Sequence, residues 1–255
     1  MKITILGTGT SQGVPMIGCN CQVCTSKNPK DHRLRSSIYI EYGDFSLLVD
    51  AGADFRQQAL KYKIPKIDAV FMTHEHRDHL SGLDDLRAYN YLQKKPIPIL
   101  AEPRVLERIL LEFDYAFQQP HVPGTPALTL QTLTAFENFN FSNFSVLPIR
   151  GLHGTLPILG LRIENFAYLT DMKFLTHQAL EKLKNLEVLV INALQYQQHA
   201  THFTVEEALQ IVEILQPKQT FLTHIAHRMG LHDQVNKDLP AQVALAYDGL
   251  VLELL

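Results

Sequence analysis

The chain is short of cysteine, of net charge and of long apolar runs, and each shortage excludes a class of protein. Its three cysteines are odd in number and lie within six residues, so they cannot form a disulfide framework. A formal net charge of −3 gives no overall attraction to polyanions. No run approaches the roughly 20 apolar residues that cross a bilayer, and residues 1–7 have the pattern of a strand rather than a signal sequence. We therefore expect a soluble, cytoplasmic protein that binds neither a membrane nor a nucleic-acid polymer.

The pattern of apolar residues indicates one α/β domain over residues 1–255, with a hydrophobic fraction of 46% that allows a sizeable core. Gly43-Asp44 and Asp248-Gly249 have the composition of hairpin turns, and strand and helix patterns alternate between them. This order favours an α+β sandwich of two mixed β-sheets covered by helices. Residues 113–143 fit neither period and predict an irregular insertion. Helices are expected at 54–63, 79–88, 103–116, 176–183 and 204–215, the last with a capping box from Thr204 to Glu207.

The three cysteines indicate a metal site near residues 19–24. Cys19, Cys21 and Cys24 form a CxCxxC pattern whose thiolates can converge on one tetrahedral zinc ion. Such a site needs a fourth ligand from elsewhere in the chain, and we expect a histidine. The competing explanations are a chance cluster of thiols and a redox pair.

A second group of metal-capable side chains follows the apolar run 67–72. The segment THEHRDH, residues 73–79, holds three histidines and an aspartate within six positions. His74 and His76 can point the same way from an extended segment, whereas Asp78 and His79 begin a helix and face a second point nearby. Two adjacent metals explain this density better than a single ion does.

Three other predicted strands also end in a residue that can bind metal. These residues are His153, Asp171 and His224, each at the end of its predicted strand. Because strand ends meet at one edge of a sheet, we expect the three side chains to gather there. Asp50 ends a further strand, where it either orients a ligand histidine or forms a turn.

Taken together, THEHRDH and the three later strand ends resemble the metallo-β-lactamase superfamily, whose fold is a four-layer αβ/βα sandwich. The cysteine pattern and Thr223-His-Ile-Ala-His227 resemble more narrowly the PhnP-like phosphodiesterases. The resemblance implies two divalent active-site ions, Zn²⁺ or Mn²⁺, and a structural Zn²⁺. His227 would be the fourth ligand of that zinc. The implied active-site ligands are His74, His76 and His153 for one ion, Asp78, His79 and His224 for the other, and Asp171 between them.

The resemblance also aligns His202 with the catalytic histidine of the subgroup. We predict His202 as general acid and Asp78 and Asp171 as catalytic through the metals they hold. A helix N-terminus destabilises an imidazolium, so the acid role needs a bound anion to raise the pKa of His202. His202 would otherwise be an ordinary polar loop residue, and His199 is the other candidate donor.

These residues predict a phosphodiesterase that hydrolyses a small, cyclic phosphate ester through a hydroxide held by two metals. One alternative is a tRNA 3′-end endonuclease, although the sequence has no basic, glycine-rich arm. Thioester or lactam hydrolysis by the same site is another. A third is a noncatalytic carrier or binding protein, as in relatives associated with pyrroloquinoline quinone synthesis. The resembled class often forms homodimers, and we expect one here.

Overall fold

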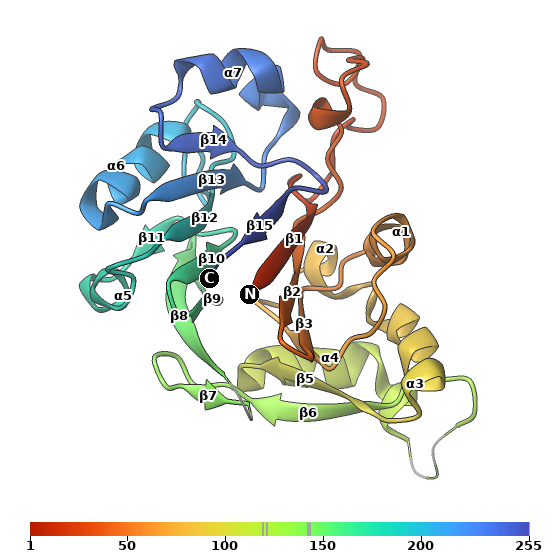
Figure 1. Cartoon of the computed structure of the whole chain (residues 1–255). Coiled ribbons are helices and arrows are strands. Elements are labelled where there is room, and N and C mark those ends of the chain that lie inside the picture. The colour runs from red at the N-terminus through yellow and green to blue at the C-terminus, as the bar shows by residue number, and fades with distance from the viewer. Residues whose placement is uncertain (119, 121, 142–143, 255) are drawn as a thin grey trace. The chain divides into compact units, whose positions relative to one another are not determined.

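The computed structural model describes residues 1–118, 120, 122–141 and 144–254, which form two compact units. Unit 1 comprises residues 1–7, 35–133 and 249–255, and unit 2 comprises residues 8–34 and 134–248. Each unit contains one mixed β-sheet with its own helices (Figure 1). The predicted fold class, with two mixed sheets and covering helices, is confirmed. The prediction of a single domain over 1–255 stays a prediction.

The sheet of unit 1 has the strand order β15-β1-β2-β3-β4-β5-β6. Neighbours from β15 to β3 are antiparallel and those from β3 to β6 are parallel. The predicted turn at Gly43-Asp44 is confirmed, because Tyr42 of β2 pairs with Phe45 of β3. The strands are β1 (Lys2–Gly7), β2 (Ser37–Tyr42), β3 (Phe45–Val49), β4 (Ala69–Phe71), β5 (Ile97–Ala101), β6 (Leu128–Thr132) and β15 (Val251–Glu253).

The helices of unit 1 are short. They are α1 (Phe55–Lys61), α2 (Arg77–Leu80), α3 (Arg87–Gln93) and α4 (Pro103–Glu112), with 3₁₀ turns η2 (Leu83–Leu86) and η3 (Asp114–Phe117). The predicted continuous helix over 79–88 is wrong. The chain breaks at Gly82, whose backbone N–H donates to the Ala51 carbonyl instead of continuing the helix. A side chain there would collide with the backbone, because a Cβ on Gly82 would lie 2.1 Å from the Gly52 carbonyl oxygen.

The sheet of unit 2 has the order β11-β8-β9-β10-β12-β13-β14, with β7 paired to β8. Neighbours from β11 to β10 are antiparallel and those from β10 to β14 are parallel. The strands are β7 (Phe139–Asn140), β8 (Ser145–His153), β9 (Leu156–Ile163), β10 (Phe166–Leu169), β11 (Phe174–Leu175), β12 (Val188–Asn192), β13 (Gln219–Thr223) and β14 (Val243–Leu245). The helices are α5 (His177–Lys182), α6 (Val205–Leu215) and α7 (His232–Asp238), with η1 (Pro29–Asp31) and η4 (His227–Met229).

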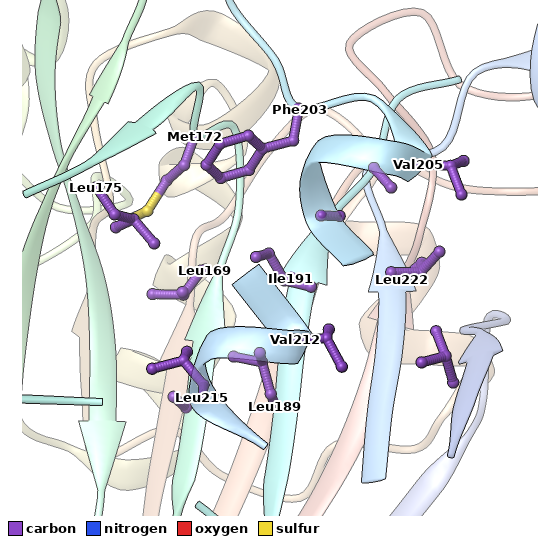
Figure 2. Close-up of a cluster of buried hydrophobic side chains, with 14 of the residues drawn as sticks. Leu169, Met172, Leu175, Leu189, Ile191, Phe203, Val205, Val212, Leu215 and Leu222 are labelled. Carbon is purple, nitrogen blue, oxygen red and sulfur yellow. The ribbon is translucent and has the colours of Figure 1, made fainter. Parts of the chain in front are cut away.

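Helix α6 covers one face of this sheet because its apolar residues follow the helical period. Figure 2 shows Val205, Val212 and Leu215 among buried side chains that include Leu189 and Ile191 of β12. The predicted capping box is present: Glu207 N–H donates to the Thr204 hydroxyl, and Thr204 N–H donates to the Glu207 carboxylate. Both terminal N–H groups are thereby satisfied, which fixes where the helix begins after the 193–203 loop.

The predicted hairpin at Asp248-Gly249 is wrong. β14 pairs in parallel with β13, whereas β15 pairs with β1. The Asp248 carboxylate explains the difference, because it accepts hydrogen bonds from the backbone N–H groups of Thr8 and Leu34. The carboxylate therefore links residues 8, 34 and 248, which are far apart in the sequence, and does not close a local turn.

Residues 113–143, predicted as an irregular insertion, contain η3 and the strands β6 and β7. Four positions of this range, 119, 121, 142 and 143, lie outside the described residues, and His121 is one of them. Within the described part of the chain, no helix has the length and apolar character needed to span a membrane.

Candidate metal-binding sites

The segment after β4 carries the predicted ligands of unit 1. His74 Nε2 lies 3.0 Å from His76 Nδ1, and His79 Nε2 lies 3.2 Å from Asp78 Oδ2. Nitrogen and oxygen ligands at about 2.0–2.2 Å from one ion lie roughly 3–3.5 Å apart in ordinary geometries. Each pair therefore has the spacing of two ligands that share an ion. The structure brings together the same pairs that the sequence pattern predicts.

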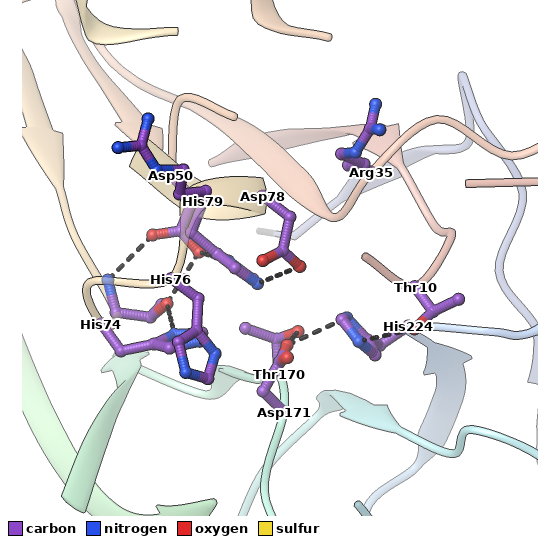
Figure 3. Close-up of polar contacts among 12 residues, drawn as sticks. Thr10, Arg35, Asp50, His74, His76, Asp78, His79, Thr170, Asp171 and His224 are labelled. Atoms are coloured by element: carbon purple, nitrogen blue, oxygen red, sulfur yellow. Dashed lines mark hydrogen bonds and ion pairs between the residues drawn. The ribbon is translucent and has the colours of Figure 1, made fainter. Parts of the chain in front are cut away.

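Asp50 contacts the imidazole of His79 at Nδ1, the ring nitrogen that does not face Asp78. Its carboxylate lies 2.7 Å from His79 Nδ1 (Figure 3). It also accepts hydrogen bonds from the Thr73 backbone N–H and hydroxyl, both at 2.8 Å. A proton on Nδ1 leaves the lone pair of Nε2 directed towards Asp78, which is the arrangement a metal requires. Complete burial raises the pKa of Asp50, while His79 and Thr73 act to lower it. Of the two roles predicted for Asp50, the contacts fit the orienting one.

The turn after β3 also fixes the backbone of this ligand segment. A Cβ on Gly52 would lie only 1.9 Å from the Asp78 carbonyl oxygen. The Ala51 N–H donates to the His79 carbonyl at 2.7 Å. Glycine at position 52 therefore lets the chain after β3 lie directly against the residues that carry the metal ligands.

In unit 2, the predicted ligands stand at the ends of separate strands. His153 ends β8, Asp171 follows β10 by two residues, and His224 directly follows β13. His224 Nδ1 lies 2.9 Å from Asp171 Oδ1 (Figure 3). His153 Nδ1 lies 2.8 Å from the Asp171 carbonyl oxygen and 3.0 Å from that of Thr201. A proton on that atom leaves Nε2 of His153 available as a ligand.

Both Asp171 and His224 have an unusual backbone conformation. Their φ angles are +62° and +54°, in the left-handed region that residues with a Cβ seldom adopt. Thr10 contributes a contact that the sequence did not predict, with its hydroxyl 3.1 Å from His224 Nε2. Strained backbone of this kind persists only where surrounding contacts hold it, and it is frequent at functional sites.

His202 lies inside a cluster of histidines in unit 2. Its ring centroid is 4.6 Å from that of His153 and 4.7 Å from that of His224. Burial, followed by the nearby His224, lowers the pKa of His202 to about 2, so the ring is neutral at neutral pH. Its Nδ1 has no hydrogen-bond partner among the described residues. Ligand atoms of His153, Asp171 and His202 lie within 4.8 Å of one another, so His202 can face either a metal or a substrate.

The other candidate residues are placed differently. His199 is exposed overall. Partial desolvation of its ring lowers its pKa, and so do the nearby positive charges of His153, Lys173 and His224. Arg77, which lies between two of the candidate ligands in sequence, forms a salt bridge with Glu112 at 3.4 Å. His232 is buried, with Nδ1 3.2 Å from the Arg33 guanidinium. Arg33 is buried too.

The three cysteines of unit 2 gather around His227. Its Nδ1 lies 3.4 Å from Cys19 Sγ and 3.3 Å from Cys21 Sγ, and all four ligand atoms lie within 4.8 Å of one another. The N–H of Cys24 and the His227 ring lower the pKa of Cys21 to about 6, whereas burial raises that of Cys24 to about 11. A thiolate is therefore present at neutral pH. The donor set and spacing fit a tetrahedral zinc.

Comparisons with known proteins agree with this arrangement. A family model described as "Beta-lactamase superfamily domain" matches residues 46–225. The crystal structure of a diphosphatase from the PhnP family is 37% identical to this chain, with a TM-score of 0.92, and the match covers 99% of this chain and 97% of that one. Zn²⁺-bound PqqB from Methylobacterium extorquens has a TM-score of 0.83 and covers 100% of both chains, but at 20% identity it shows the fold alone.

A further relative carries a different name. A protein of Porphyromonas gingivalis named octanoyltransferase is 40% identical over 98% of this chain. The match covers 51% of that protein, so this chain spans about half of its length. The family model, the relative of matching length and the histidine and aspartate clusters support a metal-dependent hydrolase. The chain belongs to the metallo-β-lactamase superfamily and, within it, to the PhnP family.

Proposed function

We propose that this protein is a metal-dependent phosphodiesterase that hydrolyses a small, cyclic phosphate ester. The observation that carries the proposal is that each unit places a histidine nitrogen about 3 Å from a carboxylate oxygen, in His79–Asp78 and in His224–Asp171. A relative of the same length and family is named a diphosphatase, which places phosphorus–oxygen bonds within the family's chemistry. A phosphodiester is the finer assignment that we add to that name.

In this proposal, seven residues hold two divalent ions, Zn²⁺ or Mn²⁺. The match to the diphosphatase over nearly the whole of both chains supports using the ligand assignment that the family resemblance implies. The assignment is His74, His76 and His153 for one ion, Asp78, His79 and His224 for the other, and Asp171 for both. Two such ions would activate a water molecule at neutral pH and neutralise charge on the attacking and leaving oxygens.

His202 completes the proposed chemistry as the proton donor to the leaving oxygen. An unpartnered nitrogen in a buried ring is costly unless a ligand or substrate satisfies it. His202 has such a nitrogen among the described residues and stacks against His224, a proposed metal ligand. Because burial keeps the free ring neutral, the anionic phosphate has to raise its pKa on binding.

The cysteine cluster has a separate role in the proposal. Cys19, Cys21, Cys24 and His227 would form a closed site for one structural Zn²⁺. A closed four-ligand site leaves no position for substrate, so it would contribute folding free energy rather than chemistry.

The second candidate function is hydrolysis of an acyl ester or thioester by the same ligands. The 40% identity to a protein named octanoyltransferase favours it, because such a name denotes acyl chemistry. However, about half of that protein lies outside the match, and the name does not say which half it describes. Phosphodiester hydrolysis therefore remains the first proposal.

The test is a substrate panel with protein reloaded with Mn²⁺ or Zn²⁺. It contains bis(p-nitrophenyl) phosphate, a nucleoside 2′,3′-cyclic phosphate, a ribosyl 1,2-cyclic phosphate, an octanoyl thioester and a pre-tRNA. We expect selective turnover of a cyclic phosphate that Asp171→Ala abolishes. Turnover of the thioester alone would establish the second candidate, and cleavage of the pre-tRNA alone would contradict the expectation of a small substrate. Full metal loading without turnover of any compound would favour a noncatalytic carrier.

A further inference from the structure

Asn192 lies among hydrogen bonds in unit 2 that reach the sequence neighbours of three candidate site residues, Asp171, His202 and His224. It is the last residue of β12 and is fully buried. Its side-chain amide makes a two-way contact with Met172, the residue after Asp171. The Met172 N–H donates to Asn192 Oδ1 at 2.7 Å, and Asn192 Nδ2 donates to the Met172 carbonyl at 2.9 Å.

The Met172 carbonyl also connects to the loop that carries His202. It accepts a second hydrogen bond, from the N–H of Phe203, at 2.9 Å. The Leu194 N–H, two residues after Asn192, donates to the Phe203 carbonyl at 2.9 Å. Figure 2 shows the ring of Phe203 beside the side chain of Met172 in the buried core. The residues directly after Asp171 and His202 are therefore held by one set of contacts.

The same strand end also fixes the approach to His224. Asn192 pairs with Thr223 in the parallel ladder between β12 and β13, and the Ala193 N–H donates to the Thr223 carbonyl at 2.9 Å. His224 is the next residue, with a φ angle of +54°. Backbone contacts at positions 192–194 thus reach the neighbours of Asp171, His202 and His224.

From this geometry we infer that Asn192 is a positioning residue, which sets Asp171 and His202 for metal binding and proton transfer through the backbone of Met172. The inference rests on the proposed function of those two residues. Asp171 adopts a φ of +62°, which surrounding contacts have to maintain. An amide side chain suits the task because it offers a donor and an acceptor at once, matching the N–H and C=O of one residue.

Asn192→Leu removes both hydrogen bonds and keeps a similar volume. We expect Zn²⁺ or Mn²⁺ affinity of the active site to fall about 10- to 100-fold, the range found when groups that orient metal ligands are removed. kcat should fall by a similar factor with a smaller change in KM. The measurements are competition against a chromophoric chelator for affinity, steady-state kinetics, and thermal unfolding of the same preparations.

Asn165→Leu is the matched control. Asn165 lies in the same unit and donates from Nδ2 to the Glu187 carboxylate at 2.7 Å, and neither residue is a proposed ligand. It should lower thermal stability without changing metal affinity. Asn192→Ser, which keeps one hydrogen-bonding group, is judged by the same criteria if the leucine variant does not fold.

Two outcomes overturn the inference. One is metal affinity and kcat for the Asn192 variant within about threefold of the unsubstituted protein. The other is an equal loss in Asn165→Leu, which would indicate general destabilisation. If the unsubstituted protein turns over no compound of the panel, the proposed reaction fails. The chelator competition still decides the role of Asn192, because it measures binding and not turnover.

Discussion

The two units present their candidate ligands in contrasting ways. In unit 1, His74, His76, Asp78 and His79 come from one segment directly after β4. One buried carboxylate, Asp50, contacts both ends of this segment through Thr73 and His79. Local geometry in unit 1 thus depends on a strand end, a short helix, one supporting side chain and the close approach of Gly52.

In unit 2, the corresponding residues are far apart in the sequence. His153 ends one strand, Asp171 and His224 follow two others, and these two have positive φ angles. Their positions depend on the register of β12 and β13 and on the contacts of Met172. A compact sequence motif can place ligands locally, whereas dispersed ligands require the tertiary structure to be complete. Substitutions that disturb the core of unit 2 should therefore disturb its ligands more.

The largest effect is expected for Asp171, which is proposed to bind both ions, whereas Asp78 is proposed to bind one. Asp171→Ala should abolish turnover and should weaken binding of both ions, because this carboxylate is proposed to bridge them. Asp78→Ala should weaken one ion while the other stays bound. Metal content per chain after dialysis and kcat on bis(p-nitrophenyl) phosphate provide the measurements. Two bound metals and normal turnover in Asp171→Ala would exclude a bridging role.

A smaller and more selective effect is expected for His202→Ala. General-acid catalysis contributes about 10²- to 10⁴-fold, and it matters most when the leaving group is a poor one. The loss should therefore be larger for an alkyl phosphodiester than for one that releases p-nitrophenolate. Equal losses for both substrates would instead favour His202 as a metal ligand.

The pH profile tests the same residue independently. Because the pKa of free His202 is lowered to about 2, its ring stays neutral as the pH changes from 8 to 5. The plot of kcat/KM, which reports the free enzyme, should therefore show no step near 6.5 that His202→Ala removes. Such a step would show that the ring titrates in its ordinary range and that burial does not control it.

The contrast between the units also explains what the sequence could predict. The spacing HxHxDH predicts which ligand atoms of unit 1 come together, because a strand end and one helical turn determine it. The role of Asp50 stayed open, since a carboxylate at a strand end has the same sequence pattern whether it forms a turn or supports a ligand. Asn192 gave no signal at all, because its partner Met172 is twenty residues away and takes part through its backbone. Likewise, the break at Gly82 follows from the close approach of Gly52, a tertiary contact.

The smallest effect on turnover is expected for the cysteine cluster, which lies in unit 2 like Asp171 but has a proposed structural role. Cys21→Ser should release one zinc per chain and lower the melting temperature, because metal binding is part of the folding free energy. For a chain of this size, each 1 kcal/mol lost lowers the melting temperature by roughly 2–4 °C.

Cys24→Ser should give the same zinc loss, since both thiols lie within 4.8 Å of the other ligand atoms. With the active-site metals restored, kcat should change far less than in Asp171→Ala. Unchanged zinc content in both variants would remove the structural-site assignment, whereas a collapse of kcat would show that the loop from His224 to His227 couples the two sites.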